Sequence, residues 1–315
     1  MKDINLETPL KHVEDTLLSK NSVRSYMTHY KKWRTFAEAK NYSVIPAKEN
    51  EFLEFLDHLV EHERTKRTII NVVLYSMISI HKYNNLKPFE IPTLDLKKLR
   101  LKALQQDVET RNGTKQSPAL YLSQVIEIVE EDDVPLRAQM ICSLMFDCML
   151  RATDLTHVEW QDIYATKNKD GVVEAYVKIY KTKGKYYPDG HSRYISTRTL
   201  NLLNEYCSIN KINRQVGFEK TKIYPFKPRQ VHRDFQMISH VMGYKVKSHS
   251  CRVGGAVEME KAGVPLTDIC NVAGWSDFRM VQYYTRNKKV SETGMATLIK
   301  KREKNKITEL PDFLN

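Results

Sequence analysis

Apolar residues recur at helical spacing through most of the 315 residues of this chain, and one long stretch interrupts the pattern. Before that stretch, the spacing predicts four helices, at residues 21–40, from 46, from 65 and at 94–104. Residues 105–119 lose the periodicity and gain Gly, Pro and polar side chains, as is typical of a linker. Because single cores stop growing near ~250 residues, the pattern predicts two domains, the first a helical bundle.

The part after the linker is also mainly helical, with one small sheet. Its patterns predict helices at 121–131 and 135–150, a short helical turn up to 160, and further helices from 197 to about 305. Residues 175–180 alternate as a strand, and Pro188-Asp189-Gly190 indicates a turn that returns the chain through 192–195. At the helix starts in the first part, we expect Asn21 or Ser22 to cap and Pro46 to occupy a first turn.

The charge of the chain favours a polyanionic partner. Lys and Arg number 50 against 38 Asp and Glu, which leaves a formal net charge of +12. Residues 1–118 carry 20 basic and 15 acidic side chains, and residues 119–315 carry 30 and 23. Because the excess is spread over both parts, it fits a two-part grip on nucleic acid better than a basic tail does. A merely basic protein without such a partner would show the same totals.

Other features narrow the class of protein. The longest mostly apolar run, at residues 69–80, contains Asn71 and Ser76 and is shorter than the ~20 residues that a membrane span needs. The amino-terminal residues lack the pattern of a signal peptide, so we expect an intracellular, cytoplasmic protein. The five cysteines form no CxxC pair, which favours buried free thiols over a zinc site or a disulfide framework.

Residues 248–287 hold the densest set of chemically useful side chains. His249 and Arg252 are three residues apart, so both project from one face at the start of a helix. The adjacent Gly254 and Gly255 permit close backbone packing there. Each of these residues alone is more often structural than catalytic. A histidine and an arginine three residues apart, for example, are usually a pair on the surface of a helix. Arginines, a histidine, an indole donor and a tyrosine together suit chemistry on a phosphodiester, because guanidinium groups bind phosphate oxygens in pairs and keep their charge.

Several motifs in this region resemble those of the tyrosine recombinases, the phage integrase family. The motifs are Arg252-Val253-Gly254, Met259-Glu260-Lys261-Ala262-Gly263-Val264, Ala273-Gly274-Trp275, Tyr284-Thr285-Arg286-Asn287 and Ser291-Glu292-Thr293-Gly294. The strong similarity covers residues 245–300, and a weaker one covers residues 150–163. The amino-terminal bundle has a compatible length and number of helices, without specific motifs.

The resemblance implies a role for each matching residue. Tyr284 resembles the nucleophile that forms a 3′-phosphotyrosyl bond, with Tyr283 as its neighbour and competitor. Arg151 and Arg252 would bind the nonbridging phosphate oxygens. The remaining implied roles are a hydrogen bond or proton transfer for His249, indole donation for Trp275, and orientation of an arginine or histidine by Asp154. Most of the wider family has histidine where Trp275 stands. The tryptophan of this chain excludes acid–base chemistry at that position.

The family also places a lysine in a β-hairpin, where it protonates the departing 5′ oxygen. The hairpin by position is residues 177–190, and Lys181, Lys183 and Lys185 compete for the role. An ungapped alignment through residues 196–203 favours Lys183, while Lys181 also fits patterns seen in the family. A lysine without this role would contact phosphates of the groove.

The resemblance further implies a two-domain, C-shaped DNA clamp. The expected parts are a helical, SAM-like core-binding domain at 1–107, a linker at 108–118, a catalytic domain at 119–290 and a tail at 291–315 for contact between protomers. Two protomers would bind each inverted-repeat site, and two sites would synapse as a tetramer that exchanges strands through a Holliday junction. No metal, ATP or other cofactor is expected, since the sequence has no P-loop and no carboxylate cluster. The alternatives are a type IB topoisomerase-like enzyme and a recombinase-like DNA-binding protein without catalysis.

Overall fold

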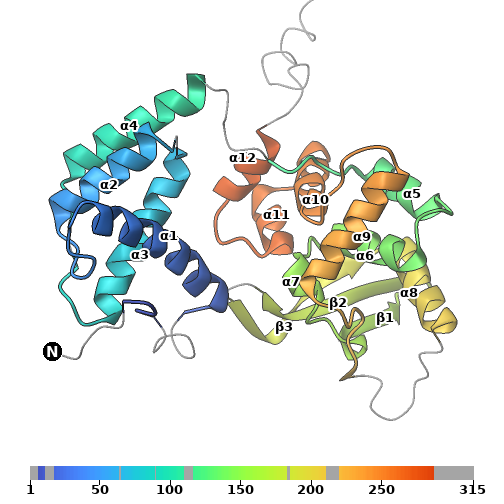
Figure 1. Cartoon of the computed structure of the whole chain (residues 1–315). Coiled ribbons are helices and arrows are strands. Elements are labelled where there is room, and N and C mark those ends of the chain that lie inside the picture. Colours follow the sequence, from blue (N-terminus) through green and yellow to red (C-terminus); the bar gives the residue numbers. More distant parts are fainter. Residues whose placement is uncertain are drawn as a thin grey trace, which may run out of the picture. The chain divides into compact units, whose positions relative to one another are not determined.

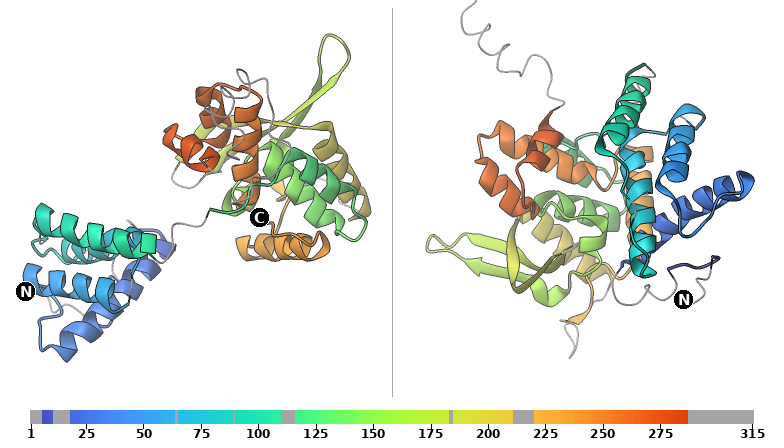
Figure 2. Two further views of the ribbon diagram at one scale, coloured as in Figure 1. Left: turned by 90° about the horizontal axis from the view of Figure 1, so that it is seen from above. Right: turned by 90° about the vertical axis from the view of Figure 1, so that its left-hand side faces the viewer.

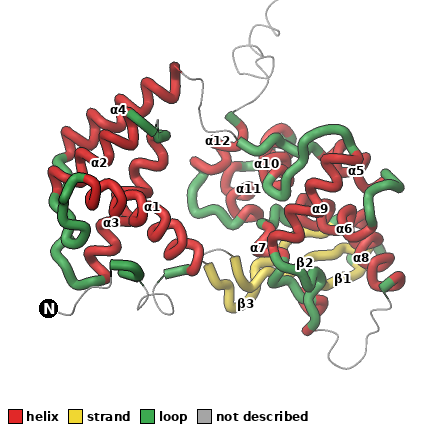
Figure 3. The backbone as a smooth tube through the Cα atoms, viewed as in Figure 1, coloured by secondary structure: helices red, strands yellow, loops and turns green. Residues whose placement is uncertain are grey.

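A computed structural model describes residues 6–10, 18–63, 65–88, 90–109, 116–182, 185–210 and 220–286. The chain divides into two compact units, Met1–Lys115 and Gln116–Asn315. Figure 1 draws the helices and strands of both units, and the buried apolar residues form a separate hydrophobic core in each. Helices predominate in both, and the described strands all lie in the second unit (Figure 3). The prediction of a mainly α chain with one small sheet is therefore confirmed.

The described residues of the first unit pack four helices around an aromatic core. The helices are α1 (Lys20–Ala39), α2 (Glu49–Glu61), α3 (Arg67–Tyr83) and α4 (Thr93–Glu109). The ring of Trp33 meets Phe52 and Phe55 edge-on, with centroids 5.1 and 5.5 Å away. Its indole N–H donates to the carbonyl of Val44 at 2.9 Å, so the one polar atom of this buried side chain is paired.

Three expectations about the ends of these helices are wrong. The cap of α1 is Ser19, whose hydroxyl accepts from the N–H of Ser22, because the helix begins one residue before Asn21. Pro46 lies ahead of α2 in a cis peptide bond with Ile45, and Lys48 occupies the N-cap position. Helix α4 continues to Glu109, into the segment expected to be irregular.

The second unit surrounds a central helix with other helices and a small sheet. The central helix is α6 (Leu136–Asp147), in which nine of twelve residues are buried. The helices around it are α5 (Leu122–Glu130), α7 (Ala152–Leu155), α8 (Thr197–Ile209), α9 (Pro228–Val241), α10 (Ser250–Lys261), α11 (Leu266–Ala273) and α12 (Arg279–Thr285). The 3₁₀ turn η2 (Trp160–Asp162) precedes the sheet. Asp147, at the end of α6, accepts hydrogen bonds from Ser196, Arg198 and Thr199, which fixes the start of α8.

The sheet has three antiparallel strands in the order β1-β2-β3. They are β1 (Ile163–Lys167), β2 (Val173–Thr182) and β3 (Lys185–Ile195), and β2 and β3 form a hairpin that extends beyond the helices of the unit (Figure 2). The predicted turn at Pro188-Asp189-Gly190 is wrong, because these residues lie inside β3. A register shift between Ile179 and Lys181 accommodates the departure from regular pairing there.

Close backbone packing holds α10 in place. A Cβ at Gly254 would lie 1.6 Å from the carbonyl oxygen of Leu120, so this helix and the segment before α5 touch through their main chains. The N–H of Leu120 also donates to the carbonyl of Ser250 at 3.1 Å. The expectation of close approach at the paired glycines is therefore confirmed at Gly254.

Two further expectations can be compared with the described residues. All five cysteines are free, and four of them are buried, as predicted. In the described ranges, no helix combines the length and apolar character that crossing a membrane requires.

Candidate active site

The residues expected to carry chemistry meet in the second unit, where α7, α10, α11 and α12 supply them. Figure 1 shows α10, α11 and α12 grouped together at the carboxyl-terminal end of the described chain. Lys183 lies outside the described residues. The expected residues that are described are Arg151, Asp154, His249, Arg252, Trp275 and Tyr284.

A hydrogen bond joins His249, at the start of α10, to Tyr284 on α12. The Nε2 atom of the imidazole lies 2.8 Å from the phenol oxygen, and the two rings meet edge to face. Burial, followed by the charges of Arg252 and Arg151, lowers the pKa of His249 below its ordinary value of 6.5. The imidazole is therefore neutral at pH 7 and, with its proton on Nδ1, can accept the phenol hydrogen.

The phenol of Tyr284 is protected from water. Its side chain is 6% exposed, and the ring of Trp275 lies 5.1 Å away between centroids. Burial raises the pKa of Tyr284, while Arg252 and Arg151 oppose the rise. The hydroxyl therefore stays protonated in the resting state and needs a base before it can attack.

The neighbouring Tyr283 occupies a different setting. It is half-buried, and its ring stacks against the guanidinium of Arg286 at 4.1 Å. Of the two tyrosines on α12, Tyr284 is the one whose hydroxyl meets His249.

Arg252 is the most deeply buried charged side chain of the group, with 0% exposure. Its Nη1 donates to the carbonyl of Met149 and its Nη2 to that of Ala273 at 3.0 Å. The guanidinium lies 5.1 Å over the ring of Trp275. Burial, followed by Arg151 and Arg193, lowers the pKa of Arg252 to about 9, so the group is still charged at pH 7.

Trp275 follows a left-handed turn at the end of α11. Gly274 has a φ of +65°, which ends the helix and directs the indole toward Tyr284. The side chain is buried, and among the described residues its indole N–H has no hydrogen-bond partner. The same is true of the buried Nε of Arg252. Two unpaired donors on neighbouring side chains indicate a place for an acceptor, because leaving them unpaired costs about 1–3 kcal/mol each.

Arg151 and Asp154 form a local pair at the start of α7. The carboxylate of Asp154 is 1% exposed and accepts from the backbone N–H of Arg151 at 3.1 Å. It also accepts from Nη1 of the same residue at 3.4 Å. One carboxylate thus fixes both the main chain and the side chain of this arginine.

The hairpin lysines are only partly visible. Lys181 is exposed and lies over the ring of Tyr186 at 5.3 Å, and Lys185 is exposed. Lys183 remains the predicted general acid, without a structural description.

Arg193, which the structure places beside this cluster, is not among the residues predicted from the sequence. Its side chain on β3 is 2% exposed, and its Nη1 donates to the carbonyl of Cys148 at 2.5 Å. The alternation of inward and outward side chains along β3 could have indicated this residue. Arg193 and Ile195 are two residues apart, and both face inward. A charged residue at an inward position of a strand indicates a special environment.

These contacts define what the cluster can do. A neutral imidazole stands ready to accept the proton of a buried phenol, and buried cationic and indole donors lie beside that phenol. Such a site suits attack by a tyrosine on an anionic, oxygen-rich group. Among the described residues, no group of three or more His, Cys, Asp or Glu side chains could hold a metal ion.

The chain belongs to the phage integrase family of tyrosine site-specific recombinases, since the model of that family matches residues 119–290. The recombinase Cre of Escherichia phage P1 is 21% identical to it over 305 residues, which cover 88% of this chain and 86% of Cre. The resemblance predicted from the motifs is therefore confirmed.

Solved structures share the fold. A lambda integrase fragment (residues 75–356), in a dimer bound to a COC′ core site, matches with a TM-score of 0.56 and 15% identity, over 90% of this chain and 95% of that one. A Tn1549 transposon integrase fragment in complex with circular intermediate DNA matches with a TM-score of 0.60 and 12% identity, over 95% and 100%. The XerH recombinase bound to palindromic difH substrate also gives 0.60, with 13% identity over 89% and 78%.

Proposed function

We propose that this protein cleaves and rejoins DNA at inverted-repeat sites through a 3′-phosphotyrosyl intermediate formed by Tyr284. The observation that carries the proposal is the 2.8 Å hydrogen bond between His249 and Tyr284, inside a cluster that also holds Arg252. The cluster would thus supply a nucleophile in Tyr284, a proton acceptor in His249 and a phosphate-binding cation in Arg252 within one buried site.

The proposed step exchanges one phosphoester for another. The Tyr284 oxygen bonds to phosphorus as its proton passes to His249, and the bond from phosphorus to the 5′ oxygen breaks. The departing oxygen takes a proton from Lys183. Because the phosphotyrosine retains the energy of the broken ester, a 5′ hydroxyl of the partner strand can reverse the attack without ATP or metal.

The other residues of the cluster would stabilise the transition state. Arg151 and Arg252 bind the nonbridging oxygens, and Trp275 donates its indole N–H to one of them. The unpaired donors of Arg252 and Trp275 support this assignment, because a phosphate would satisfy both. Asp154 orients Arg151 through its two hydrogen bonds. Removing one such donor typically slows a reaction by about 10²–10³-fold.

The partner would be double-stranded DNA, contacted by a core-binding domain at 1–107 and by a catalytic domain at 119–290. The excess of basic side chains in both parts supports this arrangement, as does the fold shared with DNA-bound integrases. Two protomers would occupy each inverted-repeat site. Two such sites would form a tetramer that exchanges one pair of strands at a time through a Holliday junction.

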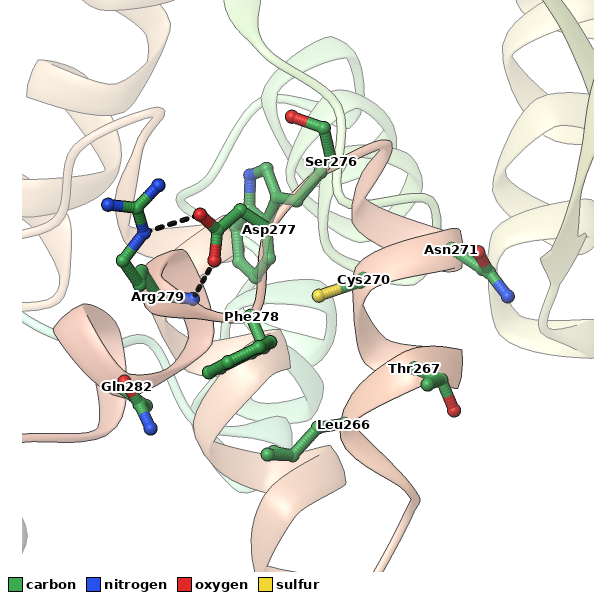
Figure 4. A pocket seen from close by; sticks show the side chains of 10 residues that line it. Leu266, Thr267, Cys270, Asn271, Ser276, Asp277, Phe278, Arg279 and Gln282 are labelled. Carbon is green, nitrogen blue, oxygen red and sulfur yellow. Dashed lines mark hydrogen bonds and ion pairs between the residues drawn. The ribbon is translucent and has the colours of Figure 1, made fainter.

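A groove on the second unit is a candidate binding site for a neighbouring protomer. It has a volume of about 670 Å³ and lies between α11 and α12, where Figure 4 shows Leu266, Cys270 and Phe278 lining it. Leu266 is 40% exposed and Phe278 56%, so apolar surface is open there. The tail at 291–315, which lies outside the described residues, contains Ile307, Leu310, Phe313 and Leu314. We assign this tail of one protomer to the groove of the next, because the two apolar segments would cover each other.

Covalent capture tests the proposal. A duplex selected by the wild-type protein from a random-sequence pool, nicked near the cleavage point, should trap a denaturant-resistant adduct. Tyr284→Phe should abolish the adduct and retain DNA binding, while the control Tyr283→Phe should leave it in place. An adduct that survives Tyr284→Phe contradicts the proposal, and binding without any adduct indicates a protein that has lost catalysis.

The assembly is tested separately. Supercoil relaxation without exchange of DNA between sites would indicate a type IB topoisomerase activity instead. Deletion of residues 291–315 should weaken cooperative assembly on DNA without abolishing binding by one protomer. Unchanged cooperativity would contradict the assignment of the tail to the groove.

A further inference from the structure

Arg193 is a buried cation that the proposed reaction leaves without a role. It lies on β3 opposite Val177 of β2, and its side chain points inward with 2% exposure. Among the described residues, no carboxylate lies within ion-pair distance of it, and its Nη2 has no hydrogen-bond partner. A buried guanidinium without an ion-pair partner is costly, so its presence at this position calls for an explanation.

One side of Arg193 holds the carboxyl end of α6. Its Nη1 donates to the carbonyl of Cys148, and Arg252 donates to the next carbonyl, that of Met149. Two arginines from different elements thus hold two consecutive carbonyls, where the partial negative charge of the helix end favours cations. Met149 has a φ of +47°, an unfavourable value for a residue with a side chain, and Arg151 follows two residues later. The paired guanidinium groups therefore fix the bend that leads into Arg151.

The other side of Arg193 faces the turn that carries Trp275. A Cβ on Gly274 would lie 3.2 Å from Nη2 of Arg193 and 3.3 Å from the hydroxyl of Tyr187. The turn therefore lies next to the guanidinium, and a side chain at Gly274 would crowd Arg193 and Tyr187 in addition to straining a backbone with a φ of +65°. His191 completes the setting, since its Nδ1 accepts from Nε of Arg193 at 3.4 Å.

Arg193 also contributes to the net positive charge of the site. Among the described residues, the carboxylate of Asp154 acts on Arg193 through its charge, and Arg151 and Arg193 both act on Arg252. Three guanidinium groups against one carboxylate leave a net charge of +2. A phosphodiester carries one negative charge, and its five-coordinate transition state carries two. Even before Lys183 and the proton received by His249 are counted, the cluster carries more positive charge than the ground-state phosphodiester carries negative charge. It therefore favours the more highly charged transition state, as catalysis by differential binding requires.

We propose that Arg193 is a positioning residue for phosphoryl transfer. It ties the bend before Arg151 to the turn before Trp275 and adds positive charge that favours the transition state over the ground state. The inference rests on the proposed function, and it assigns to β3 a part of the site in addition to the hairpin lysine.

The experiment compares two substrates and three variants of the full-length chain. The substrates are the selected nicked duplex with an ordinary scissile phosphodiester, and the same duplex with a methylphosphonate there, which removes one charged oxygen. The variants are Arg193→Gln, Arg193→Lys and the control Arg198→Gln, in which a partly buried arginine paired with Asp147 is lost from the same unit. Rates of covalent adduct formation are measured at saturating protein, beside the affinity for uncleaved duplex.

Arg193→Gln should slow cleavage of the phosphodiester by about 10²-fold, with affinity for DNA unchanged within about 2-fold. Cleavage of the methylphosphonate should slow at least about ten times less, because the groups that Arg193 positions act on the missing charge. Arg193→Lys keeps the charge without the fork, so it should recover part of the rate and of the preference between substrates. Arg198→Gln should leave that preference unchanged.

Equal slowing of both substrates by Arg193→Gln would overturn the inference, because a purely structural role affects both alike. No slowing by either substitution would also overturn it. Arg193→Lys keeps the test decisive if Arg193→Gln does not fold. A lysine variant that slows cleavage of the phosphodiester more than that of the methylphosphonate supports the inference, and one that slows both equally contradicts it. Failure of the proposed function is distinguishable, since the wild-type protein would then form no adduct that depends on Tyr284.

Discussion

Replacing Gly254 with alanine should destabilise the second unit, although alanine is the better helix former. Gly254 and Gly255 are adjacent in α10, and propensity alone predicts that either change to alanine stabilises the helix by about 1 kcal/mol. The surroundings differ. A Cβ at Gly254 meets the main chain of Leu120 at 1.6 Å, whereas one at Gly255 meets the flexible side chain of Met149 at 3.3 Å.

The magnitude follows from the displacement that the new Cβ requires. Restoring ordinary contact at 3.4 Å means moving the Leu120 carbonyl away by about 1.8 Å, which opens the hydrogen bond from Leu120 to Ser250. That bond is worth about 1 kcal/mol, and overpacking costs about 1–3 kcal/mol. Part of the burial of Leu120 is also lost, at up to about 2 kcal/mol. After the gain in propensity, Gly254→Ala should cost about 2–4 kcal/mol, against a change within about 1 kcal/mol for Gly255→Ala.

Urea unfolding of the full chain measures both variants. Trp160 and Trp275 report on the second unit by fluorescence, and Trp33 reports on the first unit, which should be unaffected. Because α10 also positions His249 and Arg252, adduct formation should fall with Gly254→Ala. A midpoint for Gly254→Ala equal to or above that of Gly255→Ala would refute the packing argument.

Three further predictions concern buried polar groups. Burial lowers the pKa of His81 below 6.5, and the neutral ring accepts a hydrogen bond from the N–H of Ala47. The stability that this histidine contributes is therefore present above pH 6.5 and lost on acidification. The urea midpoints at pH 7.5 and 5.5 should differ less for His81→Gln than for the wild type. Asp154→Asn should slow adduct formation by about 10²-fold through misplacement of Arg151, with DNA affinity retained in a filter-binding assay. Tyr224→Phe removes the hydroxyl that donates to the buried Asp234 at 2.6 Å and should lower the free energy of unfolding by about 1–3 kcal/mol, measured by urea denaturation.

Periodicity predicted the helices well because their buried faces are strongly apolar. Trp33 and Phe36 on α1 and Phe52 and Phe55 on α2 lie at the expected spacing and meet in one core. The ends of helices were less predictable, since Ser19 and Ser22 both suit a cap and only the course of the chain selects between them.

The full extent of β3 could not be predicted from neighbouring residues alone. Pro188 and Gly190 are typical of turns, yet both lie in β3, where Gly190 has a φ of +74°. A Cβ there would lie 3.0 Å from that of Lys178, so the glycine is required by the neighbouring strand. Nothing within a few residues of Gly190 reveals that contact.

The candidate site was predictable where motifs specify it and not elsewhere. The motifs placed His249, Arg252 and Tyr284 together, and the structure describes them in contact or as charge neighbours. Arg193 has no motif in the sequence analysis, because its importance depends on the distant Cys148 and Gly274. Long-range packing of this kind leaves little trace in a single sequence.

The contacts that complete the site also set an order of events during synthesis. Arg252 donates to Met149, 103 residues earlier in the chain, and Gln116 donates to the carbonyl of Tyr284 across 168 residues. Closing loops of this length costs entropy, so such contacts form late in folding. A ribosome releases the amino end first, and domains tend to fold as they emerge. Under the proposed function, a nascent chain would therefore have a folded first unit before Tyr284 reached His249, and it would be unable to break a strand until the second unit was complete.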